Sequence, residues 1–161
     1  TPPYSSAASD VYKRQRYESD HWYHYNDGIM RNGLMVATWA LTDAGPNDGG
    51  FVCVPGSHKT NFIDRLPKTV QHQELMPEYV RQPIVKAGDV ILFTEALMHG
   101  TRAWHGDHER RVLLFKYSPP HSSWAKQGYD LADYPDATEQ QRRLMAPPSV
   151  EDHAKVAGDK S

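Results

Sequence analysis

Two residues have the types and the spacing that a binding site needs, His99 and Arg110. His99 follows the apolar stretch 90–93 and precedes Gly100, which lets the backbone turn sharply. An imidazole at the rim of a β-barrel core can bind a metal ion that faces the cavity. A His that only forms a hydrogen bond at a strand end would show the same spacing, so both interpretations stand.

Arg110 and Arg111 open the apolar stretch 111–117. Because side chains alternate along a strand, one of the two should point inward and the other outward. A buried guanidinium needs an anionic partner, and a carboxylate matches its forked geometry. That partner is either a bound acidic ligand or a structural salt bridge, for which Asp89 and Glu95 are the candidates.

Short apolar stretches separated by Gly- and Pro-rich turns must position these side chains. They predict strands and an all-β sandwich or jelly roll. The expected strands are 33–42, 51–56, 83–86, 90–93 and 111–117. The first should have both faces covered, and the turn 44–50 should join it to the second as a hairpin-like pair. Residues 57–81 read as a long surface excursion.

The C-terminal part is different in character. Thr138 is a plausible N-cap for a short helix that stops near Pro147. We therefore expect a β core over residues 16–120, followed over 121–161 by an aromatic loop, the short helix and a disordered tail.

Composition limits the function classes. The chain has 161 residues, enough for one ordinary domain, with 39% hydrophobic and 24% charged residues. A net charge of −2 provides no basic surface for nucleic acid, and no apolar run approaches the length of a membrane span. Cys53 is the single cysteine, which fits a reducing compartment. We expect a cytoplasmic protein with neither a nucleic-acid nor a membrane partner.

The first fifteen residues, TPPYSSAASDVYKRQ, have no clear period. They resemble translated sequencing-adapter read-through, a contaminant of assembled environmental sequence; a flexible natural leader is the alternative. We exclude residues 1–15 from fold reasoning and expect that upstream residues are missing from this chain.

Three motifs in order carry a specific resemblance. They are GGFVCVPGSHK over 49–59, AGDVILFTEALMHG over 87–100 and ERRVLLFKYSP over 109–119. The chain resembles the phytanoyl-CoA dioxygenase family from about His21 to Pro119. These are Fe(II)- and 2-oxoglutarate-dependent oxygenases, and the resemblance implies a double-stranded β-helix (a cupin-like jelly roll), incomplete at its N-terminus.

The resemblance also implies roles for individual residues. His99 matches the distal iron-binding His, and Arg110, eleven residues later, matches the Arg that clamps the distal carboxylate of 2-oxoglutarate. Thr101 falls where a hydroxyl residue helps to hold that carboxylate. Trp39 resembles an aromatic residue of the same pocket, and His58 belongs to a structural turn.

The chain departs from the family at the first part of the iron site. The family's facial triad begins with His-x-Asp or His-x-Glu, whereas His21 and His24 both lack the carboxylate two residues later. His72 and His105 are followed by one, but they lie in the wrong places. Either the proximal pair lies upstream of this chain, or His21 or His24 is the first ligand and the carboxylate is replaced or lost, as in halogenating or inactive relatives.

These observations predict an oxidoreductase. Its full-length parent would hydroxylate a small organic substrate with O2 and oxidise 2-oxoglutarate to succinate and CO2. An iron-free, non-catalytic relative and a cupin-like small-molecule-binding domain are the rivals. The loop 60–81 and the aromatic segment 124–134 are the candidates for substrate contact. The sequence indicates neither the substrate nor the oligomeric state.

Overall fold

The computed structural model describes residues 10–13, 21–60, 66–122 and 129–147, and it divides the chain into two compact units, Thr1–Tyr117 and Ser118–Ser161. Strands dominate the first unit. They are β1 (Asp10–Lys13), β2 (Tyr23–Asn26), β3 (Ile29–Asn32), β4 (Met35–Ala40), β5 (Gly50–Cys53), β6 (Val90–Thr94), β7 (His99–Arg102) and β8 (Val112–Tyr117).

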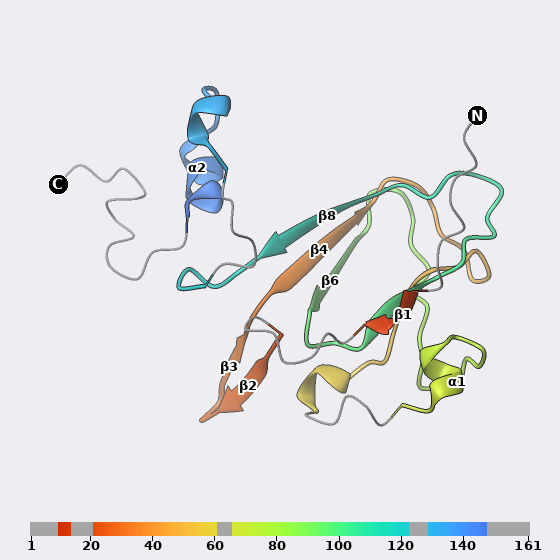
Figure 1. The fold of residues 1–161 in the computed structure, drawn as a ribbon. Helices are drawn as coiled ribbons and strands as arrows, with labels where there is room; N and C mark the ends of the chain where they lie inside the picture. Colours follow the sequence, from red (N-terminus) through yellow and green to blue (C-terminus); the bar gives the residue numbers. More distant parts are fainter. Residues whose placement is uncertain (1–9, 14–20, 61–65, 123–128, 148–161) are drawn as a thin grey trace. The chain divides into compact units, whose positions relative to one another are not determined.

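The sheet β6-β4-β8 is antiparallel, with β4 in the middle (Figure 1). The predicted strands 33–42, 90–93 and 111–117 are confirmed as β4, β6 and β8, and their ends agree within two residues. The prediction that both faces of the first strand are covered is wrong. Val36, Thr38 and Ala40 are buried, whereas on the alternate face Met35 and Trp39 are exposed and only the small Ala37 between them is buried.

The second sheet has the order β1-β7-β5. The predicted hairpin between the first two apolar strands is wrong, because β5 pairs with β7 and β4 pairs with β6 and β8. A turn-rich linker permits the chain to reverse but does not choose a partner. Residues 83–86 form no named strand, and only an isolated bridge joins Ala44 to Val85.

β1 lies within the segment that we excluded from fold reasoning. Its backbone pairs with β7, with a shift of register between Asp10 and Lys13. The rest of residues 1–15 and the whole of the predicted disordered tail lie outside the described residues.

β2 and β3 form a hairpin that the sequence analysis missed. The two-residue turn Asp27-Gly28 has φ values of 50° and 78° between the paired residues Asn26 and Ile29. An Asp-Gly turn of this kind matches the twist of adjacent strands, so the signal was present in the sequence.

The long excursion after β5 contributes to the core. It contains the 3-10 turn η1 (Ser57–Lys59) and the short helix α1 (Lys68–Gln71). Val70 and Val80 are buried against Val52. Burial of a Val side chain stabilises a fold by about 1.5–3 kcal/mol, so the segment packs as part of the domain, beyond the surface role we predicted.

The second unit contains the 3-10 turn η3 (Leu131–Asp133) and the helix α2 (Glu139–Met145). Thr138 caps α2 as predicted, because its hydroxyl accepts a hydrogen bond from the amide of Gln141 and the Gln141 side chain accepts one from the Thr138 amide. Among the described residues, no helix has the length and apolar character that crossing a membrane requires.

Candidate functional site

His99 begins β7 with one ring nitrogen already engaged. Its Nδ1 lies 2.8 Å from the carbonyl oxygen of Leu97, which can only accept, so Nδ1 carries the proton. Nε2 then faces the other way, 3.7 Å from Oε2 of Glu95. Phe51 and Phe93 flank the imidazole, with ring centroids 5.9 and 4.8 Å away. Both aromatic rings were absent from the sequence-based prediction.

The Pro-Gly-Ser-His turn holds the backbone just before His99. Ser57 Oγ is buried and accepts a hydrogen bond of 2.7 Å from the amide of Met98. Within this turn, Gly56 is the N-cap of η1 and has φ 84°, a conformation that favours glycine. His58 packs edge-on against Tyr23 at 4.8 Å, and burial, together with the charge of Lys59, lowers its pKa. The motif thus positions His99 from a distance of forty residues along the chain.

Glu95 lies between two imidazoles. Its Oε2 is 3.7 Å from Nε2 of His99 and 3.9 Å from Nε2 of His21, and its Oε1 is 2.7 Å from Nζ of Lys116. His21 is buried and the Glu95 side chain is 11% exposed. In the described part of the chain, no three His, Cys, Asp or Glu side chains are yet close enough to form a ready-made metal centre.

The structure separates the two histidines that the sequence left as alternatives. His24 is exposed on β2, whereas His21 is buried and faces Glu95. Tyr23 occupies the position two residues after His21 where the motif would carry a carboxylate. It packs against His58 instead.

Arg110 and Arg111 differ as alternation predicts. Arg111 is exposed and binds Glu109 through two hydrogen bonds of 2.9 and 2.6 Å. Arg110 is half-buried, and burial lowers its pKa. Among the described residues, no carboxylate pairs with Arg110. Of the two candidates, Glu95 forms an ion pair with Lys116, and the Asp89 carboxylate accepts a hydrogen bond from the amide of Lys86.

Arg110 lines a pocket whose other walls are mostly apolar. They include Ala40, Phe51, Val85, Ile91 and Val112. Gly50 leaves room for the guanidinium, since a Cβ there would lie 3.0 Å from Arg110 Nε. Phe51 packs on His99 with one side and lines this pocket with another, so a single aromatic ring borders both polar groups.

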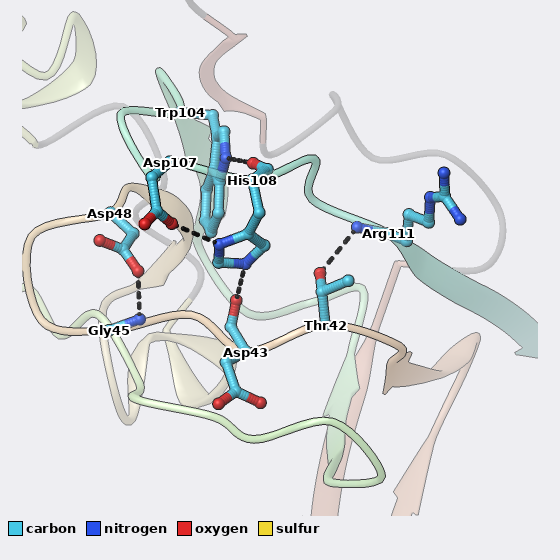
Figure 2. Close-up of polar contacts among 8 residues, drawn as sticks. All are labelled: Thr42, Asp43, Gly45, Asp48, Trp104, Asp107, His108 and Arg111. Atoms are coloured by element: carbon cyan, nitrogen blue, oxygen red, sulfur yellow. Dashed lines mark hydrogen bonds and ion pairs between the residues drawn. The ribbon is translucent and has the colours of Figure 1, made fainter.

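A polar network holds the loop that leads into Arg110 (Figure 2). Trp104 Nε1 donates to the carbonyl of His108 at 2.6 Å. The His108 ring lies 2.9 Å from Asp107 Oδ1 and 3.0 Å from the carbonyl of Asp43. The hydrogen bond to Asp107 is the main cause that raises the pKa of His108, and the same bond lowers the pKa of Asp107.

Thr101 and Trp39, the other residues predicted for the 2-oxoglutarate pocket, lie in different places. Thr101 lies on the same face of β7 as His99, two residues on, and is exposed. Trp39 lies on the opposite face of β4 from Thr38 and Ala40, which line the Arg110 pocket. The structure therefore does not place Trp39 in that pocket, because a one-residue step along a strand reverses the side chain.

The sequence did not predict that Glu95 lies beside His99 and His21. It entered only as a salt-bridge candidate for Arg110. The available signal was its spacing, four residues before His99 across the turn from β6 to β7.

The family model described as phytanoyl-CoA dioxygenase matches residues 4–112. HygX from Streptomyces hygroscopicus, in a crystal structure with nickel, 2-oxoglutarate and hygromycin B bound, is 34% identical and superimposes with a TM-score of 0.53, covering 62% of this chain and 41% of HygX. Its iron-bound structure is also 34% identical, with a TM-score of 0.50 and coverage of 62% and 42%. A comparison with curated protein sequences finds no match.

These likenesses confirm the predicted fold class, an all-β jelly roll with a short C-terminal helix. The chain spans about two fifths of the length of the HygX structures that it matches.

Proposed function

Because this chain belongs to the phytanoyl-CoA dioxygenase family, we propose that its parent protein is an Fe(II)- and 2-oxoglutarate-dependent dioxygenase. It hydroxylates a small organic substrate with O2 and oxidises 2-oxoglutarate to succinate and CO2. The observation that carries the proposal is Arg110, a half-buried guanidinium with no carboxylate partner among the described residues.

Arg110 is suited to bind the distal carboxylate of 2-oxoglutarate. A desolvated guanidinium attracts an anion strongly, and its two parallel N–H groups fit the two oxygens of one carboxylate. The apolar walls of the pocket suit the methylene groups between the two ends of the co-substrate. Thr101 shares a face with His99 and is the proposed hydroxyl contact.

The other end of the co-substrate would meet the metal. His99 and His21 are the proposed nitrogen ligands, and the exposed His24 is set aside. Bound Fe(II) would hold the 2-oxo acid end and activate O2. The residues fit such an ion because the Leu97 carbonyl keeps the proton on Nδ1 of His99 and leaves Nε2 available as a ligand. Phe51 and Phe93 pack against the ring of His99.

The substrate class is less defined than the co-substrate. HygX binds hygromycin B in its crystal structure, so this compound is the first to test with the full-length parent. We place the reaction in the cytoplasm, which the single, buried Cys53 fits.

Replacement of Arg110 tests the proposal. The dissociation constant of 2-oxoglutarate is measured without oxygen and with Fe(II), by following the visible metal-to-ligand charge-transfer band. Arg110→Ala should weaken 2-oxoglutarate by about 30-fold or more, because a partner of a buried charge pair contributes about 2–5 kcal/mol. Fe(II) affinity should change little.

Arg111→Ala is the matched control, because the same side chain is lost one residue away at an exposed site. Its expected effect is less than about twofold. Equal weakening in both variants, or none in Arg110→Ala, would contradict the clamp. The absence of a band in the wild-type chain and in its full-length parent would favour an iron-free, non-catalytic relative. This is the second candidate function, and it is supported by the presence of Tyr23, not a carboxylate, two residues after His21.

A further inference from the structure

The two oxygens of Glu95 have different surroundings. Oε1 forms an ion pair with the ammonium of Lys116 at 2.7 Å. Oε2 faces the Nε2 atoms of His21 and His99 at 3.9 and 3.7 Å. Both distances exceed the roughly 2.7–3.2 Å of a hydrogen bond, so Oε2 forms no direct hydrogen bond with either ring and a gap separates them.

The tautomer of His99 decides what can occupy the gap between its Nε2 and Glu95 Oε2. Since Nδ1 donates to the carbonyl of Leu97, a neutral His99 presents the lone pair of Nε2 to the carboxylate. A lone pair and a carboxylate oxygen repel each other unless a positive charge lies between them. A proton or a metal cation satisfies both groups, and two imidazoles with one carboxylate form the ligand set of non-haem iron sites.

Resting on the proposed function, we propose that Glu95 supplies the carboxylate ligand of the metal site, with His21 and His99 as its nitrogen ligands. This assignment answers the absence of a carboxylate two residues after His21. The acidic ligand comes from the turn between β6 and β7 in place of the strand that carries the first His.

The distances from Glu95 Oε2 to the two imidazoles are close to those within a metal-ligand set. Adjacent donors around a six-coordinate ion with bonds of about 2.1 Å lie about 3 Å apart. The two Oε2–Nε2 distances exceed this value by less than about 1 Å. At the present separations, the described residues form no closed metal centre.

Titration with Co(II) alone tests the assignment, with visible absorption and calorimetry as readouts that need no catalysis. Glu95→Gln keeps the shape of the side chain and removes the anionic ligand. It should weaken Co(II) binding by about 100-fold or more, since even loss of a group that only supports a ligand weakens metal binding by about 10–100-fold.

Lys116→Met is the matched control. Both substitutions break the Glu95–Lys116 ion pair, but only Glu95→Gln removes the proposed ligand. Lys116→Met should bind Co(II) as tightly as the wild type or more tightly. Equal losses in the two variants would show that the ion pair acts only structurally and would overturn the proposal. Far-UV circular dichroism of each metal-free variant verifies its fold.

A second pair of variants keeps the test independent of Glu95. His21→Gln should weaken Co(II) binding about as much as Glu95→Gln, and His24→Gln should leave it unchanged. Failure of the wild type to bind Co(II), or unchanged affinity in Glu95→Gln, would also overturn the assignment.

The outcomes separate this inference from the proposed function. If Glu95→Gln keeps Co(II) affinity while the wild type shows the 2-oxoglutarate band, the carboxylate lies elsewhere and the function stands. If Glu95→Gln loses Co(II) but 2-oxoglutarate never binds to the metal-loaded wild type, the metal site stands and the function fails.

Discussion

The two faces of the β6-β4-β8 sheet have opposite characters. On the inner face, Val36, Thr38 and Ala40 are 0–5% exposed. On the outer face, seven large side chains are 37–67% exposed: Met35, Trp39, Val90, Leu92, Leu113, Phe115 and Tyr117. The inner face also carries one exposed large apolar residue, Leu114, on the edge strand β8.

The residues of the candidate site lie on the inner face. The inner face meets the Arg110 pocket, and Lys116 and Phe93 on the same face reach Glu95 and His99. The outer face has the apolar composition of a core, yet its large side chains are 37–67% exposed. Substitutions should therefore be costly inside and nearly neutral outside.

The largest effect is expected at a glycine of the inner pocket. A Cβ on Gly49 would lie 1.9 Å from the backbone oxygen of Ala103, and φ is 90°. Gly49→Ala should therefore lower the free energy of unfolding by about 3 kcal/mol or more, because a backbone atom cannot move aside. Gly88 has φ 98° but open space around it, so Gly88→Ala should lose only about 1–2 kcal/mol. Urea denaturation measures both, and similar losses would mean that the pocket tolerates a side chain there.

A matched pair of leucines gives the next largest effect. Leu34 is 1% exposed and Leu92 on the outer face is 67% exposed. Leu34→Ala should lower the free energy of unfolding by about 2–5 kcal/mol, through lost burial and the cavity left behind. Leu92→Ala should stay within about 0.5 kcal/mol. Comparable denaturation midpoint shifts for the two variants would mean that the outer face is covered in solution, by a second copy or another segment.

The smallest effect concerns the exposed loop before Arg110. Protonated His108 donates to both Asp107 and the carbonyl of Asp43, so folding raises its pKa above the ordinary value of about 6.5. Its stabilisation is complete below that value and is lost as pH rises through the higher folded pKa. It also falls away at low pH as Asp107, whose pKa is lowered, becomes protonated.

Thermal melting of His108→Gln should therefore differ from the wild type most near pH 5–6 and least near pH 9. The expected shift is on the order of 1 °C, because the pair is solvent-exposed. His72→Gln, at an exposed His outside this network, is the control. A difference that grows with rising pH would contradict the assignment of the proton.

Local signals predicted some of the elements, but they missed β2, β3 and β7. The alternating apolar stretches marked β4, β6 and β8, and Thr138 marked the start of α2, because strand period and helix capping depend on neighbouring residues. They did not predict pairing. The turn after β4 suggested a hairpin with β5, but β5 pairs with β7, which lies about fifty residues further along the chain.

By itself, the sequence determined the family, the central strands β4, β6 and β8, and the alternation that sends one of Arg110 and Arg111 inward and the other outward. These follow from motif order and from a side-chain period of two residues. Only the tertiary structure decided that His21, and not His24, faces Glu95, and that Trp39 lies away from the Arg110 pocket. Such choices depend on which distant strands pair and in what register, and no local pattern encodes either.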